Sequence, residues 1–316
     1  MKQRALGTSG MTSSEIGFGC MGLTWAYGRA QTQSDAIALL HRAMDLGVTL
    51  FDTADMYGPF TNEQLLGKAL SGRRDGVVVA TKCGNIVHDA RTYDIRRDAR
   101  PEYIARACDE SLKRLGIDVI DLYQLHRVDP NVPVEESIGA MADLVRLGKV
   151  RAIGLSEVDV PLLERAAAVY PIASLQSEFS LWERNVQSDI LPWCEQNGTA
   201  LIAYSPLGRG FLTGRLKKTD IADGDFRELL PRFQGAAFDA NQKIVEQLGT
   251  IAQRVGATPG QIALAWILAT SPVTVPIPGT KHVAYVEENA GAANVQLSPD
   301  DLSELNGLAL PTGARY

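Results

Sequence analysis

The chain has 316 residues, of which 45% are apolar and 22% charged, and its formal net charge is −6 at pH 7. This is an ordinary globular composition, and without a block of Lys or Arg it argues against nucleic acid as a partner. No run approaches the roughly 18 apolar residues of a membrane span, and the N-terminus lacks the apolar core of a signal peptide. We therefore expect a cytoplasmic protein that does not bind a membrane.

The cysteines and histidines argue against a metal or disulfide framework. The four cysteines show no CxxC spacing, which favours reduced thiols in the cytoplasm. The four histidines are scattered and form no HxH or other convergent ligand cluster, so a metal-dependent barrel hydrolase is set aside. These residues are Cys20, Cys83, Cys108, Cys194, His41, His88, His126 and His282.

Short β-branched runs recur along the chain and alternate with helical patterns. Runs that are apolar on consecutive positions are typical of strands buried on both faces of a parallel sheet. Helices are predicted at 34–47, 101–116 and 133–148, because each segment begins with a helix start signal and finishes on a glycine. In chain order the predicted strands are 15–20, 48–52, 77–82, 119–126, 150–156, 172–176, 199–205 and 272–279.

Eight strands in βαβ order favour a closed (β/α)8 TIM barrel with extended loops at the carboxyl ends of its strands. No linker or change of composition divides the sequence, so we expect one domain over residues 1–316. An open, doubly wound sheet is the alternative. It would require an early GxGxxG turn between a strand and a helix, and "GTSG" and "GFGCMG" lack that context.

Polar residues stand at the end of one predicted strand after another. In a barrel these positions meet at one rim, where barrel enzymes carry out their chemistry. Alone, each residue has a structural explanation, such as a capping carboxylate, a lysine that reaches solvent, or a hydrogen-bonded histidine. The residues are Asp52, Lys82, His126, Ser156, Gln176 and Ser205, with Tyr57 in the loop after the second strand.

One chemical task explains four of these residues together: protonating an oxygen while hydride reaches its carbon. A phenol titrates near 10, and a neighbouring ammonium lowers that pKa, so Lys82 would assist Tyr57 as a proton donor. A buried lysine needs a carboxylate to remain charged, and Asp52 can serve that purpose. The imidazole of His126 can orient the substrate carbonyl.

With these residues in place, the sequence resembles the aldo-keto reductase superfamily over nearly its whole length, from "LGTSG" at 6–10 to "LSPDDL" at 297–302. The motifs keep the order of the family, and their form is similar to the bacterial, plant and yeast branches, among them pyridoxal-reductase-like and auxin-induced-protein-like members. They are "FDTADMYG" at 51–58, "TK" at 81–82, "DLYQLH" at 121–126, "IGLS" at 153–156, "AYSPLGRGFLTG" at 203–214, "IPGT" at 277–280 and "EEN" at 287–289.

The resemblance implies an NADPH-dependent enzyme that reduces a small aldehyde or ketone, with the catalytic tetrad Asp52, Tyr57, Lys82 and His126. Ser156 and Gln176 would hold the carboxamide of the nicotinamide, and Tyr204 would stack on its ring. Lys281, with Gly279 and Thr280, would bind the 2′-phosphate. The other cofactor residues implied are Cys20, Met21, Asp52, Ser205, Pro206, Leu207, Gly208, Arg209, Arg215, Glu288 and Asn289.

The sequence departs from the family pattern at two places. Many members have Asn where this chain has Glu157, which leaves the role of that carboxylate open. The compact branch has a lysine directly after "IP" and an arginine six positions later, where this chain has Gly279 and Tyr285. We therefore expect the phosphate to be bound by a different arrangement centred on Lys281.

A second hypothesis of another class is a cofactor-sensing interaction protein, like the potassium-channel β-subunits that share the fold. Those relatives carry a different residue at the position of His126, so its presence here favours the enzyme. Aromatic residues in the predicted rim loops could wall an apolar substrate pocket or pack between loops. They are Trp25, Tyr27, Phe60 and Trp182.

Overall fold

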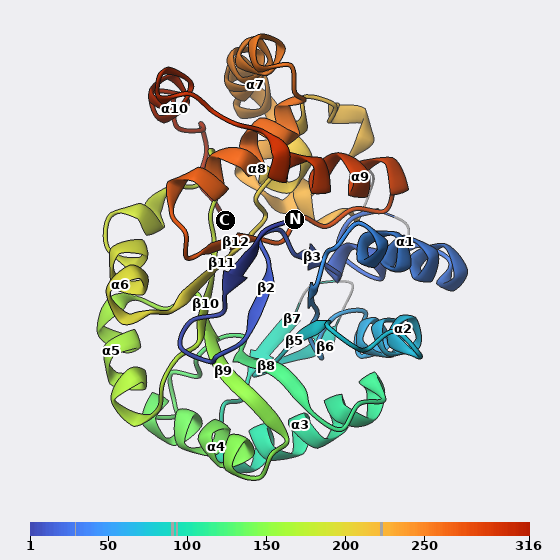
Figure 1. Cartoon of the computed structure of the whole chain (residues 1–316), viewed down its shortest axis with the longest axis vertical. Helices are drawn as coiled ribbons and strands as arrows, with labels where there is room; N and C mark the ends of the chain where they lie inside the picture. Colours follow the sequence, from blue (N-terminus) through green and yellow to red (C-terminus); the bar gives the residue numbers. More distant parts are fainter. Residues whose placement is uncertain (29, 90–91, 93, 222–223) are drawn as a thin grey trace.

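Eight parallel strands form the centre of the protein, as Figure 1 shows. The computed structural model describes residues 1–28, 30–89, 92, 94–221 and 224–316. Each strand pairs with its neighbours in chain order, which confirms the predicted (β/α)8 fold. The strands are β3 (Phe18–Gly19), β4 (Leu50–Asp52), β5 (Val78–Cys83), β8 (Ile120–Leu125), β9 (Val150–Ser156), β10 (Ser174–Glu178), β11 (Ala200–Tyr204) and β12 (Thr274–Pro276).

Backbone hydrogen bonds join the two edge strands and close the barrel. The N–H of Gly17 donates to the carbonyl of Pro276 at 2.9 Å, and that of Gly19 donates to Pro278 at 3.3 Å. A Cβ atom on Gly19 would lie 2.8 Å from the carbonyl oxygen of Ile277. Glycine is required here because the two backbones approach too closely for a side chain.

The helices form a ring outside the strands (Figure 1). Each of the first six follows one strand and returns the chain to the start of the next, as right-handed βαβ units require. Two helices precede β12 and two follow it. The helices are α1 (Gln33–Asp45), α2 (Thr61–Leu70), α3 (Pro101–Leu115), α4 (Val134–Arg146), α5 (Val160–Val169), α6 (Ile190–Asn197), α7 (Gly235–Val255), α8 (Pro259–Thr270), α9 (Val283–Gly291) and α10 (Pro299–Asn306).

The ends of the helices follow local signals in the sequence, with small shifts from the predicted bounds. Pro101 begins α3, and Gly116 ends it in a left-handed conformation at φ 64°. The helix α1 begins earlier than predicted because the Thr32 side chain accepts a hydrogen bond from the N–H of Asp35. Pro133 precedes the first turn of α4 instead of lying within it.

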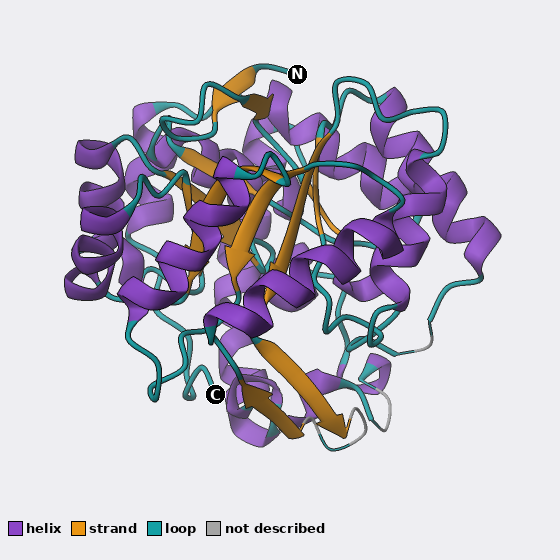
Figure 2. Cartoon of the chain, turned by 90° about the horizontal axis from the view of Figure 1, so that it is seen from below, coloured by secondary structure: helices purple, strands orange, loops and turns teal. Residues whose placement is uncertain are grey.

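Two short hairpins lie at opposite ends of the barrel, and the sequence predicted neither (Figure 2). The hairpin of β1 (Gln3–Ala5) and β2 (Thr12–Ser14) covers the amino ends of the strands. Leu6 and Met11, beside its turn, pack into the inner core of the barrel. The hairpin of β6 (Asn85–Asp89) and β7 (Asp94–Arg97) extends from β5 at the other end, on the same side as the end of the chain.

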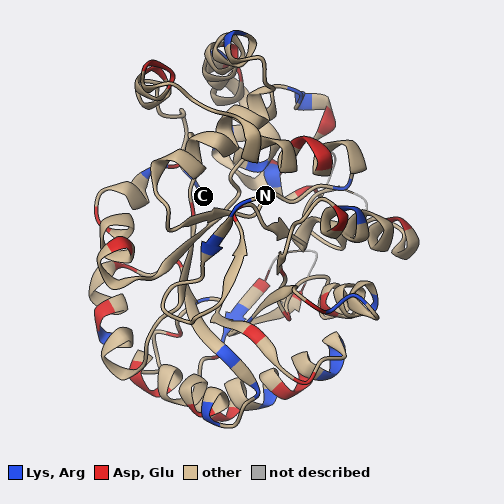
Figure 3. Ribbon diagram, in the orientation of Figure 1, with Lys and Arg blue, Asp and Glu red and all other residues tan. Residues whose placement is uncertain are grey.

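Charges of both signs are interspersed over the outer helices (Figure 3). This mixture agrees with the absence of a single basic block in the sequence. Within the described ranges, no helix is long and apolar enough to cross a membrane.

Candidate active site

A cavity of about 640 Å³ opens at the carboxyl ends of the strands. Its walls come from the strand ends, from the β6–β7 hairpin and from the short 3₁₀ helices after β11, chiefly η3 (Gly208–Thr213) and η5 (Phe226–Leu229). Its size is typical of a small-molecule site. This is the rim where the sequence placed its candidate residues.

The four residues of the predicted tetrad come together at the inner end of this cavity. The Nζ atom of Lys82 lies 2.6 Å from Asp52 Oδ1, 2.8 Å from the carbonyl of Thr53 and 3.4 Å from the Tyr57 hydroxyl. The Lys82 side chain is fully buried, and that of Asp52 is 4% exposed. His126 follows β8 directly, and its ring meets the Tyr57 ring edge-on with 5.8 Å between centroids. Three neighbouring strands therefore supply one contiguous group.

The buried ion pair keeps Lys82 charged. Burial is the largest influence on its pKa and by itself lowers it, but Asp52 and Tyr57 outweigh burial and hold the pKa above the ordinary value. Burial also raises the pKa of Tyr57, an effect that Lys82 offsets only in part. The phenol is therefore protonated at neutral pH. The sequence predicted the direction of the lysine's influence but missed the larger effect of burial.

His126 is a neutral imidazole in this environment. Burial, with the positive charges of Lys82 and Arg127, holds its pKa well below the usual range. Its backbone N–H donates to the carbonyl of Cys83, which fixes the residue beside β5. Among the described residues, the buried Nδ1 atom has no hydrogen-bond partner. The ring can thus exchange hydrogen bonds with a carbonyl substrate without carrying a charge.

The residues predicted to hold the carboxamide lie beside the tetrad. Gln176 donates from Nε2 to Asp52 Oδ2 at 2.8 Å, so it also supports the carboxylate. Ser156 accepts at Oγ from Arg127 Nη1 at 3.0 Å. Arg127 lines the cavity and was not predicted by the sequence analysis. The only signal for it was its position directly after His126.

Most of the predicted cofactor residues line the same cavity. Cys20 and Gly208 do not: both are buried behind its wall. A Cβ atom on Gly208 would lie 2.3 Å from the ring of Trp182, so this glycine allows close packing behind the cavity. The residues that line it are Met21, Asp52, Ser156, Gln176, Tyr204, Ser205, Pro206, Leu207, Arg209, Arg215, Gly279, Thr280, Lys281, Glu288 and Asn289.

The outer end of the cavity is rich in cations. Lys281 donates from Nζ to the backbone carbonyl of Tyr27, and burial lowers its pKa, an effect opposed by nearby Asp225. Arg215 pairs with Glu288 at 2.8 Å, and Arg227 lies over the Tyr27 ring. Asp225 is a carboxylate close to Lys281 that the sequence analysis did not indicate, because the two residues are 56 positions apart.

Arg209, one of the cofactor residues that the resemblance implied, lines the cavity and pairs with Glu178. Its two terminal nitrogens donate to the two carboxylate oxygens at 2.8 and 2.9 Å, and both side chains are almost fully buried. Glu157, whose role the sequence left open, accepts from the N–H of Glu178 and from Arg315. These residues form a second polar cluster beside Tyr204.

Of the four aromatic residues in the rim loops, two line the cavity and two do not. Trp25 and Tyr27 line the cavity, and the Trp25 ring lies 6.4 Å from that of Tyr57. Phe60 is half exposed under the guanidinium of Arg114. Trp182 is buried and packs on Phe211 with 4.3 Å between centroids, so it belongs to the core.

The arrangement of polar groups fits a nicotinamide dinucleotide phosphate. A buried acid–base group lies at the inner end, an aromatic ring stands beside it at Tyr204, and lysine and arginine side chains stand at the outer end. Within the described residues, no cluster of histidine, cysteine, aspartate or glutamate could hold a metal ion. The barrel and the four residues at its rim are arranged as in one class of enzyme, the nicotinamide-dependent oxidoreductases.

Comparison with known proteins places the chain within that class. A model of the aldo/keto reductase family matches residues 15–309, and the chain belongs to this family. It is similar to the glycerol dehydrogenase AKR11B4 from Gluconobacter oxydans, with 28% identity, a TM-score of 0.88 and coverage of 97% of this chain and 94% of the other. Membership in the family supports NAD(P)-dependent oxidoreductase activity.

Two further solved structures extend this similarity. The aldo-keto reductase AKR11C1 from Bacillus halodurans, in its holo form, is 29% identical with a TM-score of 0.83, and the match covers 100% of this chain and 98% of the other. An aldo/keto reductase from Klebsiella pneumoniae, in complex with NADP and acetate, is 28% identical with a TM-score of 0.77, at the same coverage.

Proposed function

We propose that the protein is an NADPH-dependent reductase of small aldehydes or ketones, in which Tyr57 is the general acid. The observation that carries this proposal is the contact of the buried Lys82 Nζ with both Asp52, at 2.6 Å, and the Tyr57 hydroxyl, at 3.4 Å, directly behind the wall of the cavity that Asp52 and Tyr57 line. A complex of a Klebsiella pneumoniae neighbour with NADPH supports the choice of cofactor.

The cofactor would supply a hydride to the carbonyl carbon, and the residues of the chain would manage the oxygen. His126 would orient the carbonyl oxygen toward the Tyr57 hydroxyl, which would donate its proton as negative charge develops. Lys82 would stabilise the resulting phenolate, and Asp52 would keep Lys82 charged. Trp25 would exclude water from the reacting atoms.

The outer end of the cavity favours NADPH over NADH. The 2′-phosphate carries close to two negative charges, and Lys281, the Thr280 hydroxyl and the amino end of α9 would bind it. Arg215 and Arg227 are the nearest alternatives, and each is already paired with a carboxylate, Glu288 and Asp225 respectively. We assign Lys281 as the main phosphate ligand because it stands two residues before α9, whose amino end also favours an anion.

Tyr57→Phe tests the reaction directly. We expect a loss of turnover on the order of 10²–10⁴, because the substitution removes the general acid. NADPH affinity should remain largely unchanged, since the substitution removes only the Tyr57 hydroxyl and keeps its ring. Turnover would be followed by NADPH consumption over a panel of small aldehydes and ketones. Tyr170→Phe, the same change at a residue outside the cavity, is the matched control.

If Tyr57→Phe keeps more than about half of the wild-type turnover, Tyr57 is not the acid. If the wild type binds NADPH but consumes it with no member of the panel, the reductase proposal is wrong. A cofactor-sensing interaction protein would then be the better explanation.

A further inference from the structure

A polar cluster of four charged side chains lies beside Tyr204, outside the proposed tetrad. Arg315 donates from Nε to Glu178 at 2.7 Å and from Nη2 to Glu157 at 2.8 Å. Arg209 pairs with both oxygens of Glu178. Two guanidinium groups therefore neutralise two carboxylates: Arg209 and Glu178 are buried, and Arg315 and Glu157 are partly exposed.

The same cluster holds the phenol of Tyr204. Arg315 Nη2 donates to the Tyr204 hydroxyl at 2.6 Å, and the hydroxyl of Tyr316 lies 3.0 Å from it. The guanidinium of Arg315 lies 4.9 Å from the centroid of the Tyr316 ring, and that of Arg209 lies 5.4 Å from it. The Tyr204 ring is thus fixed at its polar end while the ring lines the cavity.

The backbone around this cluster adopts conformations that are unfavourable for side chains. Among the described residues, five non-glycine residues have positive φ, and three of them are Glu157 at 54°, Ser205 at 48° and Arg209 at 55°. Such conformations cost about 1–2 kcal/mol, and asparagine adopts them more readily than glutamate. Glutamate at position 157 is therefore unfavourable for the backbone. Its carboxylate accepts hydrogen bonds from Arg315 and from the N–H of Glu178.

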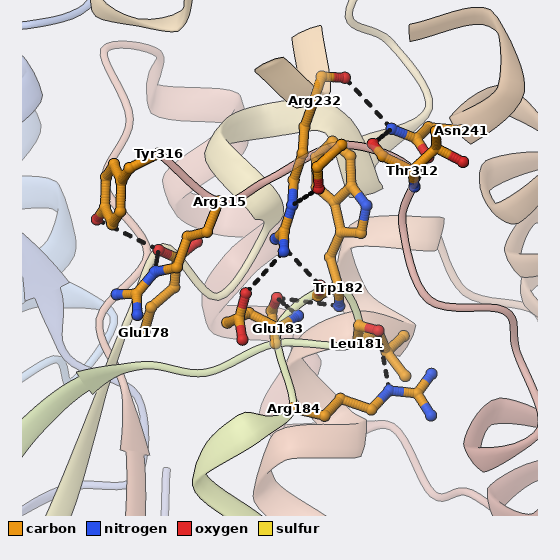
Figure 4. Close-up of polar contacts among 12 residues, drawn as sticks. Glu178, Leu181, Trp182, Glu183, Arg184, Arg232, Asn241, Thr312, Arg315 and Tyr316 are labelled. Atoms are coloured by element: carbon orange, nitrogen blue, oxygen red, sulfur yellow. Dashed lines mark hydrogen bonds and ion pairs between the residues drawn. The ribbon is translucent and has the colours of Figure 1, made fainter. Parts of the chain in front are cut away.

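The segment that carries Arg315 is fixed along its length, as Figure 4 shows. Thr312 and Asn241 exchange two hydrogen bonds, and Arg232 donates to the carbonyl of Gly313. The guanidinium of Arg232 is itself held by Glu183 at 2.9 Å. Arg315 and Tyr316 lie beyond the residues that match the family model, which ends at 309.

We propose that Arg315 is a positioning residue for the nicotinamide, and that Glu157 serves as its anchor and not as a ligand of the carboxamide. Arg315, held by Glu157 and Glu178, fixes the Tyr204 ring against which the nicotinamide lies. The inference rests on the proposed function, since it takes NADPH as the bound group. It predicts that substitutions of Arg315 or Glu157 weaken binding of the nicotinamide and do not change binding of the 2′-phosphate.

A double-mutant cycle with two ligands tests this inference. The variants are Glu157→Gln, Arg315→Gln and their combination, each titrated with NADPH and with 2′-phospho-adenosine diphosphate ribose, which lacks the nicotinamide. We expect each single variant to weaken NADPH binding about tenfold and the double variant no more than the stronger single one. Binding of the nicotinamide-free nucleotide should change less than about twofold.

Arg184→Gln is the matched control. Arg184 donates to the carbonyls of Leu305 and Asn306, so it holds the end of α10, which precedes the Arg315 segment, and it does not line the cavity. It should leave both affinities unchanged. Arg315→Lys retains the charge but cannot bridge two carboxylates and a phenol, and its NADPH affinity should fall between wild type and Arg315→Gln. If Arg315→Gln does not fold, Arg315→Lys and Glu157→Gln form the cycle.

Three results would overturn the inference: unchanged NADPH affinity in both single variants, equal weakening of both nucleotides, or additive effects in the double variant. These binding measurements need no turnover. An inactive wild type that binds NADPH and shows the cycle would therefore refute the proposed reaction while leaving Arg315 as a positioning residue. Variants with reduced activity and unchanged NADPH affinity would refute Arg315 as a positioning residue and leave the proposed reaction standing.

Discussion

Two ionic clusters lie on the same rim of the barrel and differ in what their cations can do. In the first, the ammonium of Lys82 is shared between Asp52 and the Tyr57 hydroxyl. In the second, the guanidinium groups of Arg209 and Arg315 both donate to the carboxylate of Glu178, and Arg315 also donates to Glu157.

The difference follows from the shapes of the two cations. A lysine ammonium is a compact charge that stabilises whichever neighbouring oxygen becomes negative, so it suits a phenol that loses a proton. A guanidinium has several donors in a fixed plane and holds its partners in one geometry. The first cluster is therefore suited to proton transfer, and the second to fixing Tyr204. Substitutions in each cluster should separate these two roles.

Lys82→Met should have the largest effect, a loss of carbonyl reduction on the order of 10²–10⁴. The substitution removes the charge that stabilises the Tyr57 phenolate and leaves Asp52 as an uncompensated buried carboxylate, so stability should fall as well. The measurement is the pH–rate profile beside that of Lys113→Met, an exposed lysine paired with Glu110. An unchanged profile would remove Lys82 from the proton-donating group.

The raised pKa of Lys82 also leads us to expect that the stability of the wild type depends on pH. The folded-state pKa of Lys82 is raised above 10.5, so its contribution is fully present below that pH and is lost as pH rises through the folded value. Denaturation between neutral and strongly alkaline pH should show this loss in the wild type and not in Lys82→Met.

Glu178→Gln should affect stability more than chemistry. Removing this carboxylate leaves the guanidinium of Arg209 buried without its bidentate partner, which costs about 3–5 kcal/mol in comparable sites. Glu135→Gln, in an exposed bidentate pair with Arg165, should cost less than about 1 kcal/mol. Urea denaturation compares the two variants. Similar small losses would show that the second cluster does not hold the fold together.

Lys281→Ala addresses a third cation on the rim, whose ammonium donates to a backbone carbonyl. We expect NADPH affinity to fall about ten- to a hundred-fold and to lose part of its salt dependence. NADH affinity should barely change, because NADH lacks the 2′-phosphate. Dissociation constants for both cofactors at two salt concentrations provide the test. Equal weakening of both cofactors would instead point to Arg215 or Arg227.

Asp55→Asn should have the smallest effect on stability. Asp55 lies next to the first cluster, where its backbone N–H donates to the carbonyl of Lys82. Burial, with the nearby charge of Glu63, raises the pKa of Asp55 to about 8, and within the described residues its Oδ1 atom lacks a hydrogen-bond partner. Because the folded pKa exceeds the unfolded value, Asp55 makes the wild type less stable as pH rises from about 4 to 8. The variant should be more stable by about 1–2 kcal/mol at pH 8.

Unfolding free energies at pH 5 and pH 8 check this prediction, because the gain should be clearly larger at the higher pH. An equal gain at both values would mean that Asp55 does not titrate in this range. Carbonyl reduction should remain, since Asp55 does not line the cavity.

The sequence predicted the barrel and the tetrad because both depend on local patterns. Buried parallel strands appear as β-branched runs, and the topology of a barrel brings their carboxyl ends to one rim. Asp52 and Lys82 lie at the carboxyl ends of consecutive paired strands, 30 positions apart, so their meeting follows from the order of the strands. The strand bounds differed by up to three residues, as at β3, which begins at Phe18 where residue 15 was predicted.

The pairing of Arg315 with Glu157 was decided by the tertiary structure alone. These residues are 158 positions apart, and they meet only because the segment after α10 is fixed across the rim and the backbone of Glu157 has positive φ. The pairing of Arg209 with Glu178, 31 positions away, has the same origin. A long arginine side chain can reach several partners, and its sequence neighbours do not determine which of them the packed fold brings within reach.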